Sequence, residues 1–224
     1  MMRHPHALGQ GMASGRTRSR LIQELRSDGI QNAEVLAAIE RVPRHEFVEE
    51  ALASRAYDNV ALPIGYGQTI SQPLVVAWMT ERLIADGKPP DVLEVGTGSG
   101  YQAAVLAELG ITVYTTERIK PLYELARRRL RALGYSRVRC RLSDGSLGLP
   151  DYAPFSSIIV TAAAPEIPPA LLEQLRVGGR LVMPLGERGM QRLVVIKRTQ
   201  RGYERLAQDP VSFVPLLPGV EQGE

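Results

Sequence analysis

The sequence has few of the residues that build disulfide scaffolds and metal centres. Cys140 is the only cysteine among the 224 residues, so an internal disulfide bond is impossible. Histidine occurs 3 times, and two of these residues, His4 and His6, lie at the very start of the chain. Because cysteine and histidine are the usual zinc ligands, a disulfide scaffold and a cysteine-based zinc cluster are excluded. No metal site is predicted.

Long apolar runs are also missing. No stretch approaches the roughly 18 consecutive apolar residues that a membrane-spanning helix needs, so no membrane partner is expected. The first part of the chain contains several arginines but no apolar core of the kind found in a secretory signal. We therefore expect a cytoplasmic protein whose residues 1–15 form a disordered basic tail.

A strong excess of one charge is absent too. The 27 Lys and Arg residues and the 24 Asp and Glu residues leave a net charge of +3, far less than a nucleic-acid-coating protein carries. Arginines do cluster locally, at Arg127, Arg128, Arg129 and Arg131. We interpret this cluster as a solvated helix face, so no nucleic-acid partner is expected. A non-catalytic RNA-binding protein stays open as an alternative, because the cluster would support it.

Residues 16–90 combine a helical pattern with a punctuated segment. Apolar residues recur at helical spacing in two early segments, the second of which follows the N-cap residue Asn32. A third short helix is expected around residues 47–52. Residues 57–72 contain proline and glycine at close intervals, which predicts a structured loop leading into a helix that begins at Pro73.

After Pro90, apolar strands alternate with helical segments. Strands are predicted at residues 92–95, 111–116, 138–142, 157–161, 180–185, 192–198 and 204–214. Helices are predicted at residues 101–109, 121–133 and 169–175. Alternation of this kind predicts a mostly parallel, seven-stranded sheet with helices on both faces. A turn near Gly202 joins the last two strands into an antiparallel hairpin.

We expect one α/β domain over residues 16–224, because a chain of this length fits a single domain of this class. Residues 16–90 would supply N-terminal helices and a loop. Residues 91–189 would form a ligand-binding core, and residues 190–217 the C-terminal hairpin.

The most informative local motif is a glycine-rich turn after the first predicted strand of the sheet. It reads Gly96-Thr97-Gly98-Ser99-Gly100 and opens a helix, so the backbone allows a ligand to approach and the helix start offers free N–H groups. A dinucleotide-binding turn has the spacing G-x-G-x-x-G, whereas Tyr101 stands where its third glycine would be. Glu94, just before the turn, would repel a pyrophosphate but suits a ligand with a cationic end.

Two further acids follow the next two strands. Glu117 is placed to accept hydrogen bonds from both hydroxyls of a ribose, and Asp144, beside Gly145, could accept one from an adenine amino group. With Glu94, these acids outline one cleft that fits an adenosyl ligand carrying a sulfonium. The pattern and the terminal hairpin resemble the Rossmann-like class I S-adenosylmethionine-dependent methyltransferases. S-adenosylmethionine is therefore the expected cofactor.

Two kinds of nucleic-acid methyltransferase do not fit. Enzymes that methylate amino groups of DNA carry an acid or amide followed by Pro-Pro-aromatic after the fourth strand, but Thr161-Ala162-Ala163-Ala164-Pro165 stands here. Cytosine-carbon methylation needs a nucleophilic cysteine, whereas Cys140 lies inside a predicted buried strand.

A longer series of motifs resembles the protein-L-isoaspartate O-methyltransferase family. The most specific are Pro63-Ile64-Gly65-Tyr66-Gly67-Gln68-Thr69-Ile70-Ser71-Gln72-Pro73 and Phe213-Val214-Pro215-Leu216. Others follow the family in order, among them Val42-Pro43-Arg44, Ala56-Tyr57-Asp58, Glu117-Arg118-Ile119 and Asp144-Gly145. The resemblance covers about residues 16–217. It departs at Ser143 and Ser146, where the family usually has a glycine and an aromatic residue, so packing around an adenine is expected to be looser.

The resemblance implies a protein-repair enzyme. It would transfer the methyl group of S-adenosylmethionine to the free α-carboxylate of L-isoaspartyl residues in damaged proteins and peptides, and the ester would lead through a succinimide back to aspartate. A carboxylate is already ionised at neutral pH, so no strong general base is needed, in agreement with the scarcity of histidine. Isoaspartyl proteins and peptides are the expected partners, and a monomer is expected. A small-molecule carboxyl or hydroxyl methyltransferase is the closer alternative.

The family's active-site serine corresponds to Ser71. Its hydroxyl is expected to hold one oxygen of the acceptor carboxylate while the other attacks, and capping of the helix at Pro73 is the alternative role. The resemblance implies these cofactor-binding residues: Thr69, Ile70, Ser71, Glu94, Gly96, Thr97, Gly98, Ser99, Gly100, Glu117, Arg118, Asp144 and Gly145. It implies these substrate-binding residues: Pro63, Ile64, Gly65, Thr69, Ser71, Val211, Phe213 and Val214. Residues 211–216 would pair with an extended peptide.

Overall fold

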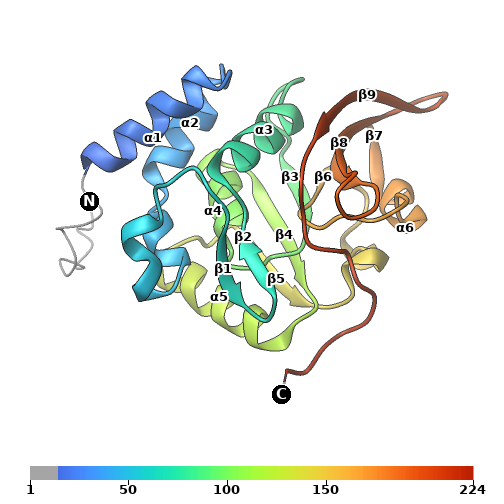
Figure 1. The fold of residues 1–224 in the computed structure, drawn as a ribbon. Helices are drawn as coiled ribbons and strands as arrows, with labels where there is room; N and C mark the ends of the chain where they lie inside the picture. The colour runs from blue at the N-terminus through green and yellow to red at the C-terminus, as the bar shows by residue number, and fades with distance from the viewer. Residues whose placement is uncertain (1–14, 224) are drawn as a thin grey trace.

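The computed structural model describes residues 15–223 (Figure 1). Apart from its last residue, Gly15, the predicted disordered tail lies outside the described residues. The α-helices are α1 (Gly15–Ser27), α2 (Ala33–Arg41), α3 (Pro73–Leu83), α4 (Tyr101–Glu108), α5 (Lys120–Ala132) and α6 (Pro169–Glu173). The 3-10 helices are η1 (Arg44–Phe47), η2 (Glu50–Arg55), η3 (Gly145–Leu147) and η4 (Pro150–Tyr152).

The strands form a large sheet and a small one. The strands are β1 (Leu62–Gly65), β2 (Gln68–Ile70), β3 (Asp91–Val95), β4 (Thr112–Glu117), β5 (Val138–Leu142), β6 (Phe155–Val160), β7 (Leu175–Leu185), β8 (Arg192–Thr199) and β9 (Gly202–Pro210). The large sheet has seven strands in the order β5-β4-β3-β6-β7-β8-β9. Strands β3 to β7 pair in parallel, whereas β8 pairs antiparallel with both β7 and β9. The predicted seven-stranded sheet with an antiparallel end is confirmed.

The strand order places the site. After β3 the chain moves through α4 to β4 on one side, and the strand on the other side of β3 is β6. The order of the strands therefore reverses at β3, and loops leaving the carboxyl ends of β3 and β6 diverge there. A crevice outside the strand ends is the expected ligand site of such a sheet.

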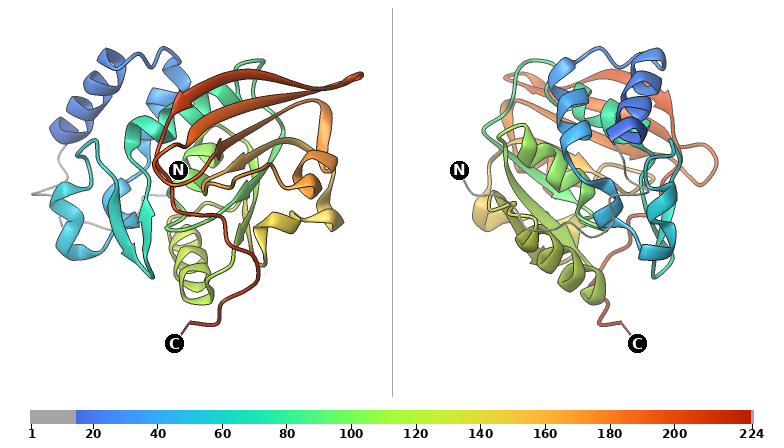
Figure 2. Two further views of the ribbon diagram at one scale, coloured as in Figure 1. Left: turned by 45° about the vertical axis from the view of Figure 1, so that its right-hand side comes forward. Right: turned by 90° about the vertical axis from the view of Figure 1, so that its left-hand side faces the viewer.

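The two faces of the sheet are covered unequally. The larger apolar cluster packs the helices α1 through α5 against one face of the sheet. It includes Leu25, Phe47 and Val105 together with Val92 and Val113 of the strands. The smaller cluster covers the other face with little more than α6, which has 5 residues. Figure 2 shows α1 on the same side of the molecule as the β1-β2 hairpin, away from the tip of the β8-β9 hairpin. Helices on both faces are confirmed, with most of the cover on one.

Asn32 shows how local sequence fixes one helix start. Its Oδ1 accepts hydrogen bonds from the N–H groups of Glu34 (3.0 Å) and Val35 (3.2 Å), which are unsatisfied donors of the first turn of α2. The predicted N-cap is confirmed.

The predicted loop over residues 57–72 is wrong in part, because it contains the hairpin β1-β2. Leu62 pairs with Ile70, and Pro63 pairs with Thr69. Leu62, Ile64 and Ile70 are buried, so one face of the hairpin joins the main core. Each strand is short and the glycines of the tip interrupt the pattern, which is why the sequence alone indicates only a loop.

Other boundaries also differ from the predictions. The expected third helix is divided into η1 and η2. Strand β7 begins at Leu175, so α6 ends earlier than predicted, and β9 ends at Pro210 rather than Val214. Pro210 explains the second difference, since a proline has no N–H to donate to a strand ladder.

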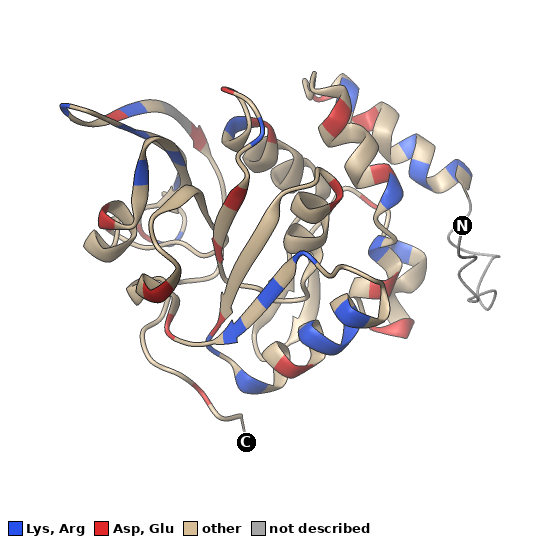
Figure 3. Cartoon of the chain, turned by 180° about the vertical axis from the view of Figure 1, so that it is seen from behind, with Lys and Arg blue, Asp and Glu red and all other residues tan. Residues whose placement is uncertain are grey.

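Basic side chains gather at one edge of the sheet. Figure 3 shows Lys and Arg along α5 and on the outer strand β5 beside it. Arg139 donates to the hydroxyl of Tyr114 (3.0 Å), and Arg141 to that of Tyr152 (2.5 Å).

None of the helices within residues 15–223 is long and apolar enough to cross a membrane.

Candidate active site

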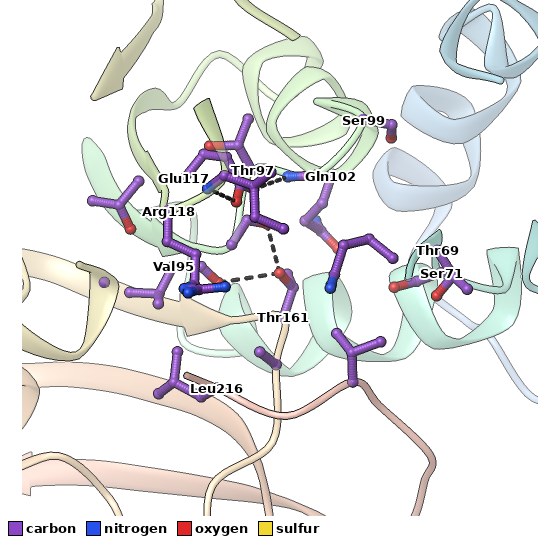
Figure 4. A pocket seen from close by; sticks show the side chains of 18 of the residues that line it. Thr69, Ser71, Val95, Thr97, Ser99, Gln102, Glu117, Arg118, Thr161 and Leu216 are labelled. Carbon is purple, nitrogen blue, oxygen red and sulfur yellow. Dashed lines mark hydrogen bonds between the residues drawn. The ribbon is translucent and has the colours of Figure 1, made fainter. Parts of the chain in front are cut away.

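A cavity that is partly open to solvent lies at the strand ends. It is lined by Gln68, Thr69, Ile70, Ser71, Val76, Val95, Gly96, Thr97, Gly98, Ser99, Tyr101, Gln102, Thr116, Glu117, Arg118, Ile119, Gly145, Thr161, Ala162, Val214, Pro215, Leu216 and Leu217. Figure 4 shows Glu117 and Arg118 at one end, and Thr69 and Ser71 at the other. The carboxyl ends of β3, β4 and β6, the β1-β2 hairpin and the C-terminal segment therefore all contribute to one cavity.

The glycine turn has no room for a side chain at Gly96. This residue has φ of 96°, and a Cβ there would lie 2.5 Å from Oγ1 of Thr161. That hydroxyl donates to the carbonyl oxygens of Gly96 (2.6 Å) and Val95 (3.1 Å). Thr161, at the end of β6, thus binds the turn at the end of β3, and the backbone is left bare toward the cavity.

Glu117 is buried at the end of β4 and fixes the turn from the other side. Its Oε2 accepts the N–H of Gly98 (2.8 Å), and its Oε1 accepts the N–H of Ile119 (2.9 Å). A carboxylate oxygen has a second lone pair for a further hydrogen bond. Because Glu117 also lines the cavity, it is held in place with acceptor capacity left for a diol such as a ribose.

Glu94 is also buried, but it does not line the cavity. Neither of its carboxylate oxygens has a hydrogen-bond partner within residues 15–223. Burial raises the pKa of Glu94 to about 8, and the charge of Glu117 adds to the rise, while Thr115 opposes it. The side chain therefore lies beneath the turn as a group that favours the protonated form, and its contact with a cationic ligand stays a prediction.

Asp144 lies just outside the cavity with both oxygens engaged. Oδ1 accepts the N–H (2.9 Å) and the hydroxyl (2.6 Å) of Ser146, and Oδ2 accepts the N–H of Gly219 (2.7 Å). Partial burial would raise the pKa of Asp144, but the bonds from Gly219 and Ser146 outweigh it and lower the pKa. The expected bond to an adenine amino group would have to share or replace the bond to Gly219.

The last described residues are docked beside this end of the cavity. The N–H of Glu221 donates to the carbonyl of Arg118 (2.8 Å), and its carbonyl accepts the N–H of Lys120 (2.9 Å). The side chain of Arg118 donates to the carbonyl of Gly219 (3.2 Å) and pairs with the carboxylate of Glu221 (2.8 Å). Arg118 lines the cavity, but its guanidinium is committed to the C-terminal tail.

The opposite end of the cavity carries hydroxyl groups. Thr69 is exposed and Ser71 is half-buried between β2 and α3. The N-cap position of α3 is Gln72, and no side chain caps this helix. The alternative capping role of Ser71 is therefore not observed, and its hydroxyl bonds to no other described residue while its carbonyl is held by Arg44 (2.7 Å).

The C-terminal segment closes one side of the cavity by pairing with the loop after β6. The N–H of Ala163 donates to the carbonyl of Val214 (2.8 Å), and the N–H of Leu216 donates to the carbonyl of Ala163 (2.7 Å). The backbone of Phe213 is held by the side-chain amide of Gln191. The N–H of Val214 donates to no other described residue, so it is available to a ligand.

The expected cofactor-binding residues line the cavity, apart from Glu94, Gly100 and Asp144. Of the expected substrate-binding residues, Thr69, Ser71 and Val214 line it. The others do not, namely Pro63, Ile64, Gly65, Val211 and Phe213. Ile64 is buried in β1, and Val211 and Phe213 pack against the main core, so they support the wall from behind.

Sequence reasoning assigned no role to several lining residues, including Val76, Gln102, Ile119, Thr161 and Leu217. The sequence pattern could have identified Thr161 as a site residue, because this polar residue directly follows a continuous apolar strand. No such pattern marks Gln102, since a glutamine in the first turn of a helix is usually solvated.

The residues present fit an adenosyl ligand with a sulfonium better than a phosphorylated one. Glu117 offers acceptors for a diol, and a bare glycine backbone lies beside it. The carboxylate of Glu117 would repel a phosphate at this place. Within residues 15–223, no group of three or more His, Cys, Asp and Glu residues is placed to hold a metal ion.

The comparisons with known proteins agree with this geometry. A family model described as Protein-L-isoaspartate(D-aspartate) O-methyltransferase (PCMT) matches residues 16–221. A protein-L-isoaspartate O-methyltransferase of Halorhodospira halophila is 56% identical over 97% of this chain and 99% of its own length. One of Alkalilimnicola ehrlichii is 59% identical over 94% of this chain and 96% of its own length.

A solved structure shows that the fold is shared as well. The protein of Plasmodium falciparum described as a PCMT in complex with S-adenosyl-L-homocysteine superposes with a TM-score of 0.78 and 26% identity, covering 90% of this chain and 98% of that one. Fold, cavity and sequence lead to the same assignment. The chain belongs to the protein-L-isoaspartate O-methyltransferase family.

Proposed function

We propose that the cavity is the active site of a protein-repair reaction, with the methyl donor at the Glu117 end and the acceptor at the Ser71 end. As a member of its family, the chain transfers the methyl group of S-adenosylmethionine to the free α-carboxylate of L-isoaspartyl residues in damaged proteins and peptides. The ester then leads through a succinimide back to aspartate. The observation that carries the placement is one cavity with a fixed carboxylate at one end and an unpartnered hydroxyl at the other.

The donor end needs only binding and orientation. S-adenosylmethionine supplies an electrophilic methyl group on a sulfonium sulfur. Glu117 would accept the ribose hydroxyls, and the backbone of Gly96 and Gly98 would lie against the ligand. Leu216 and Leu217 would cover it and exclude water. Holding both reactants in a water-poor site is the main contribution expected of the protein, because effective molarity supplies much of the rate.

The acceptor end has to hold an anion. The hydroxyl of Ser71 would donate to one oxygen of the acceptor carboxylate, which leaves the other oxygen to attack. The acceptor is ionised at neutral pH, so no base is required. His45 is consistent with this, because it bonds with Tyr57 (2.8 Å) and does not line the cavity.

The backbone next to the cavity would select a peptide. The N–H of Val214 lies on the segment that pairs with Ala163, and it donates to no other described residue. The backbone of an isoaspartyl peptide would supply an acceptor for it, as in recognition by strand addition. A small-molecule acceptor would make no use of it.

Several finer points remain part of the proposal. We propose that the enzyme acts as a monomer in the cytoplasm, without nucleic-acid or membrane partners, and that residues 16–224 form one domain.

Two peptides that differ only in one linkage test the function. The enzyme is incubated with labelled S-adenosylmethionine and either an isoaspartyl peptide or the same peptide with normal aspartate. We expect label on the isoaspartyl peptide alone. Equal labelling of both peptides, or labelling of neither, would refute the proposed function.

A further inference from the structure

Arg44, at the start of η1, is a fully buried cation without a carboxylate partner. Its side chain is 0% exposed, and it forms no ion pair with any residue that the structure describes. A buried charge is costly unless it is paired, so its retention needs an explanation.

The groups around Arg44 belong to the wall of the active site. Its Nη2 donates to the carbonyl of Ser71 at 2.7 Å and lies 3.4 Å from the carbonyl of Val60. Its guanidinium carbon lies 4.6 Å from the ring centre of Tyr101. Ser71 and Tyr101 both line the cavity, so the charge lies directly behind the end where the hydroxyls are.

The partners of Arg44 leave its charge uncompensated. Nε and Nη1 of Arg44 and the hydroxyl of Tyr101 are buried without a hydrogen-bond partner among residues 15–223. Burial raises the pKa of Tyr101 to about 12, so this phenol is neutral at physiological pH and cannot serve as a counterion. Two carbonyls and a ring face solvate the cation in part.

We propose that Arg44 is a positioning residue for methyl transfer, because it fixes the backbone of Ser71 and places an uncompensated positive charge behind the site of the acceptor carboxylate. This inference rests on the proposed function. Nη2 of Arg44 joins the carbonyl of Ser71 to that of Val60, so the hydroxyl is presented from a fixed backbone. The charge attracts the anionic acceptor through a medium of low dielectric constant. The same charge disfavours a sulfonium.

Two variants separate the bonds to the backbone from the charge. Arg44→Met removes both, whereas Arg44→Lys keeps the charge on a shorter side chain that lacks the planar guanidinium. Arg41→Met is the matched control, since Arg41 is an exposed arginine that pairs with Glu108 (2.9 Å) away from the cavity. Folding of each variant is checked by circular dichroism, and kcat and KM are measured with the isoaspartyl peptide.

The two nucleoside ligands report the charge itself. S-adenosylmethionine carries one positive charge more than S-adenosylhomocysteine, so the ratio of their dissociation constants senses the local potential. Calorimetry gives both constants for the enzyme and its variants. General loosening of the site would weaken both ligands together and leave the ratio unchanged.

We expect Arg44→Met to lower kcat/KM about 100-fold and to shift the ratio about threefold or more in favour of S-adenosylmethionine. Arg44→Lys should lower kcat/KM about tenfold and leave the ratio unchanged, and the control should stay within about twofold of the parent enzyme. If Arg44→Met does not fold, the kcat/KM of Arg44→Lys is the test of the inference.

Three results would overturn the inference. One is a kcat/KM close to that of the parent enzyme in a folded Arg44 variant. Another is an unchanged ratio of the two dissociation constants in Arg44→Met. The third is a loss of affinity for S-adenosylhomocysteine that equals the loss of kcat/KM. If the parent enzyme itself fails to methylate the isoaspartyl peptide, the proposed function fails instead, and the ratio still tests the charge of Arg44.

Discussion

The two ends of the cavity are built in different ways. At the Glu117 end, neighbouring parallel strands supply the groups, and each is locked by backbone hydrogen bonds such as those from Gly98 and Ile119. At the Ser71 end, a short hairpin and a C-terminal segment supply them, and both lie outside the large sheet. The first end depends on the sheet, and the second depends on contacts between segments far apart in sequence.

The difference separates binding from reaction. A methyl donor bound at the sheet needs a rigid cradle, whereas the acceptor end has to recognise a peptide and hold an anion. Substitutions at the Glu117 end should therefore lower cofactor affinity, and those at the Ser71 end should lower turnover while cofactor affinity persists. Substitutions at each end test whether the two ends are separate in this way.

The largest effect is expected for Ser71→Ala. Loss of the hydroxyl removes the donor that orients the acceptor carboxylate, so kcat should fall about 100-fold, as for other donors to a reacting anion. Affinity for S-adenosylhomocysteine should stay within about twofold. Steady-state kinetics and calorimetry measure the two quantities, with Ser27→Ala on the exposed face of α1 as the control. Equal losses in kcat and affinity would break the division between the two ends.

Glu117→Ala should act on affinity. It leaves the N–H groups of Gly98 and Ile119 unpaired and removes the acceptors for the ribose, which should cost about 1–3 kcal/mol of binding free energy. Titration calorimetry with S-adenosylhomocysteine measures the loss. Glu108→Ala, at a half-buried residue of α4 that pairs with Arg41 and does not line the cavity, is the control. An unchanged affinity would remove Glu117 from the binding site.

Glu94→Gln should change the pH dependence of stability. The pKa of Glu94 is raised by burial to about 8 in the folded state, so the folded protein holds a proton that the unfolded chain releases near its ordinary value of 4.5. This contribution to stability is complete below that ordinary value and is lost as the pH rises to about 8.

The variant carries no titrating group at this position. At pH 8.5 it should therefore exceed the parent protein in free energy of unfolding by about 1–3 kcal/mol, and near pH 4.5 the two should be similar. Urea unfolding across this pH range measures the difference, and Glu34→Gln on exposed α2 should follow the parent curve. Parallel curves for Glu94→Gln and the parent would show that Glu94 is not held in its protonated form.

Gly96→Ala tests the close approach in the glycine turn and should have the smallest effect of the series. Gly134 has a similar φ of 82°, but a Cβ there meets nothing within 4 Å, whereas one at Gly96 would meet Thr161. Both alanine variants strain the backbone, so the difference between them isolates the contact. We expect Gly96→Ala to be about 1–2 kcal/mol less stable than Gly134→Ala in urea unfolding. Equal stabilities would show that Thr161 moves away without cost.

The glycine turn and the sheet could be predicted because their signals are local. A continuous apolar strand, a glycine turn and an acid at the next strand end follow one another within a short stretch, and parallel pairing brings them together. Glu117 and the cavity-lining glycines were found in this way. The antiparallel end of the sheet followed from two alternating segments separated by a turn.

The rest could not be predicted because it depends on tertiary contacts. The hairpin β1-β2 is stable only where its buried face meets the main core, and the sequence pattern of such short strands does not differ from that of a loop. The bond between Asp144 and Gly219 joins residues far apart in the chain. Glu94 looks like a ligand-facing acid by its place before the turn, and only the pleat of β3 shows that it lies beneath it.

The most direct test of the account is a crystal structure with S-adenosylhomocysteine and an isoaspartyl peptide bound together. We expect the ribose hydroxyls on Glu117, the sulfur between the two ends of the cavity, and the peptide carboxylate on the hydroxyl of Ser71. A nucleoside bound away from the Gly96 turn, or a peptide carboxylate far from Ser71, would contradict it.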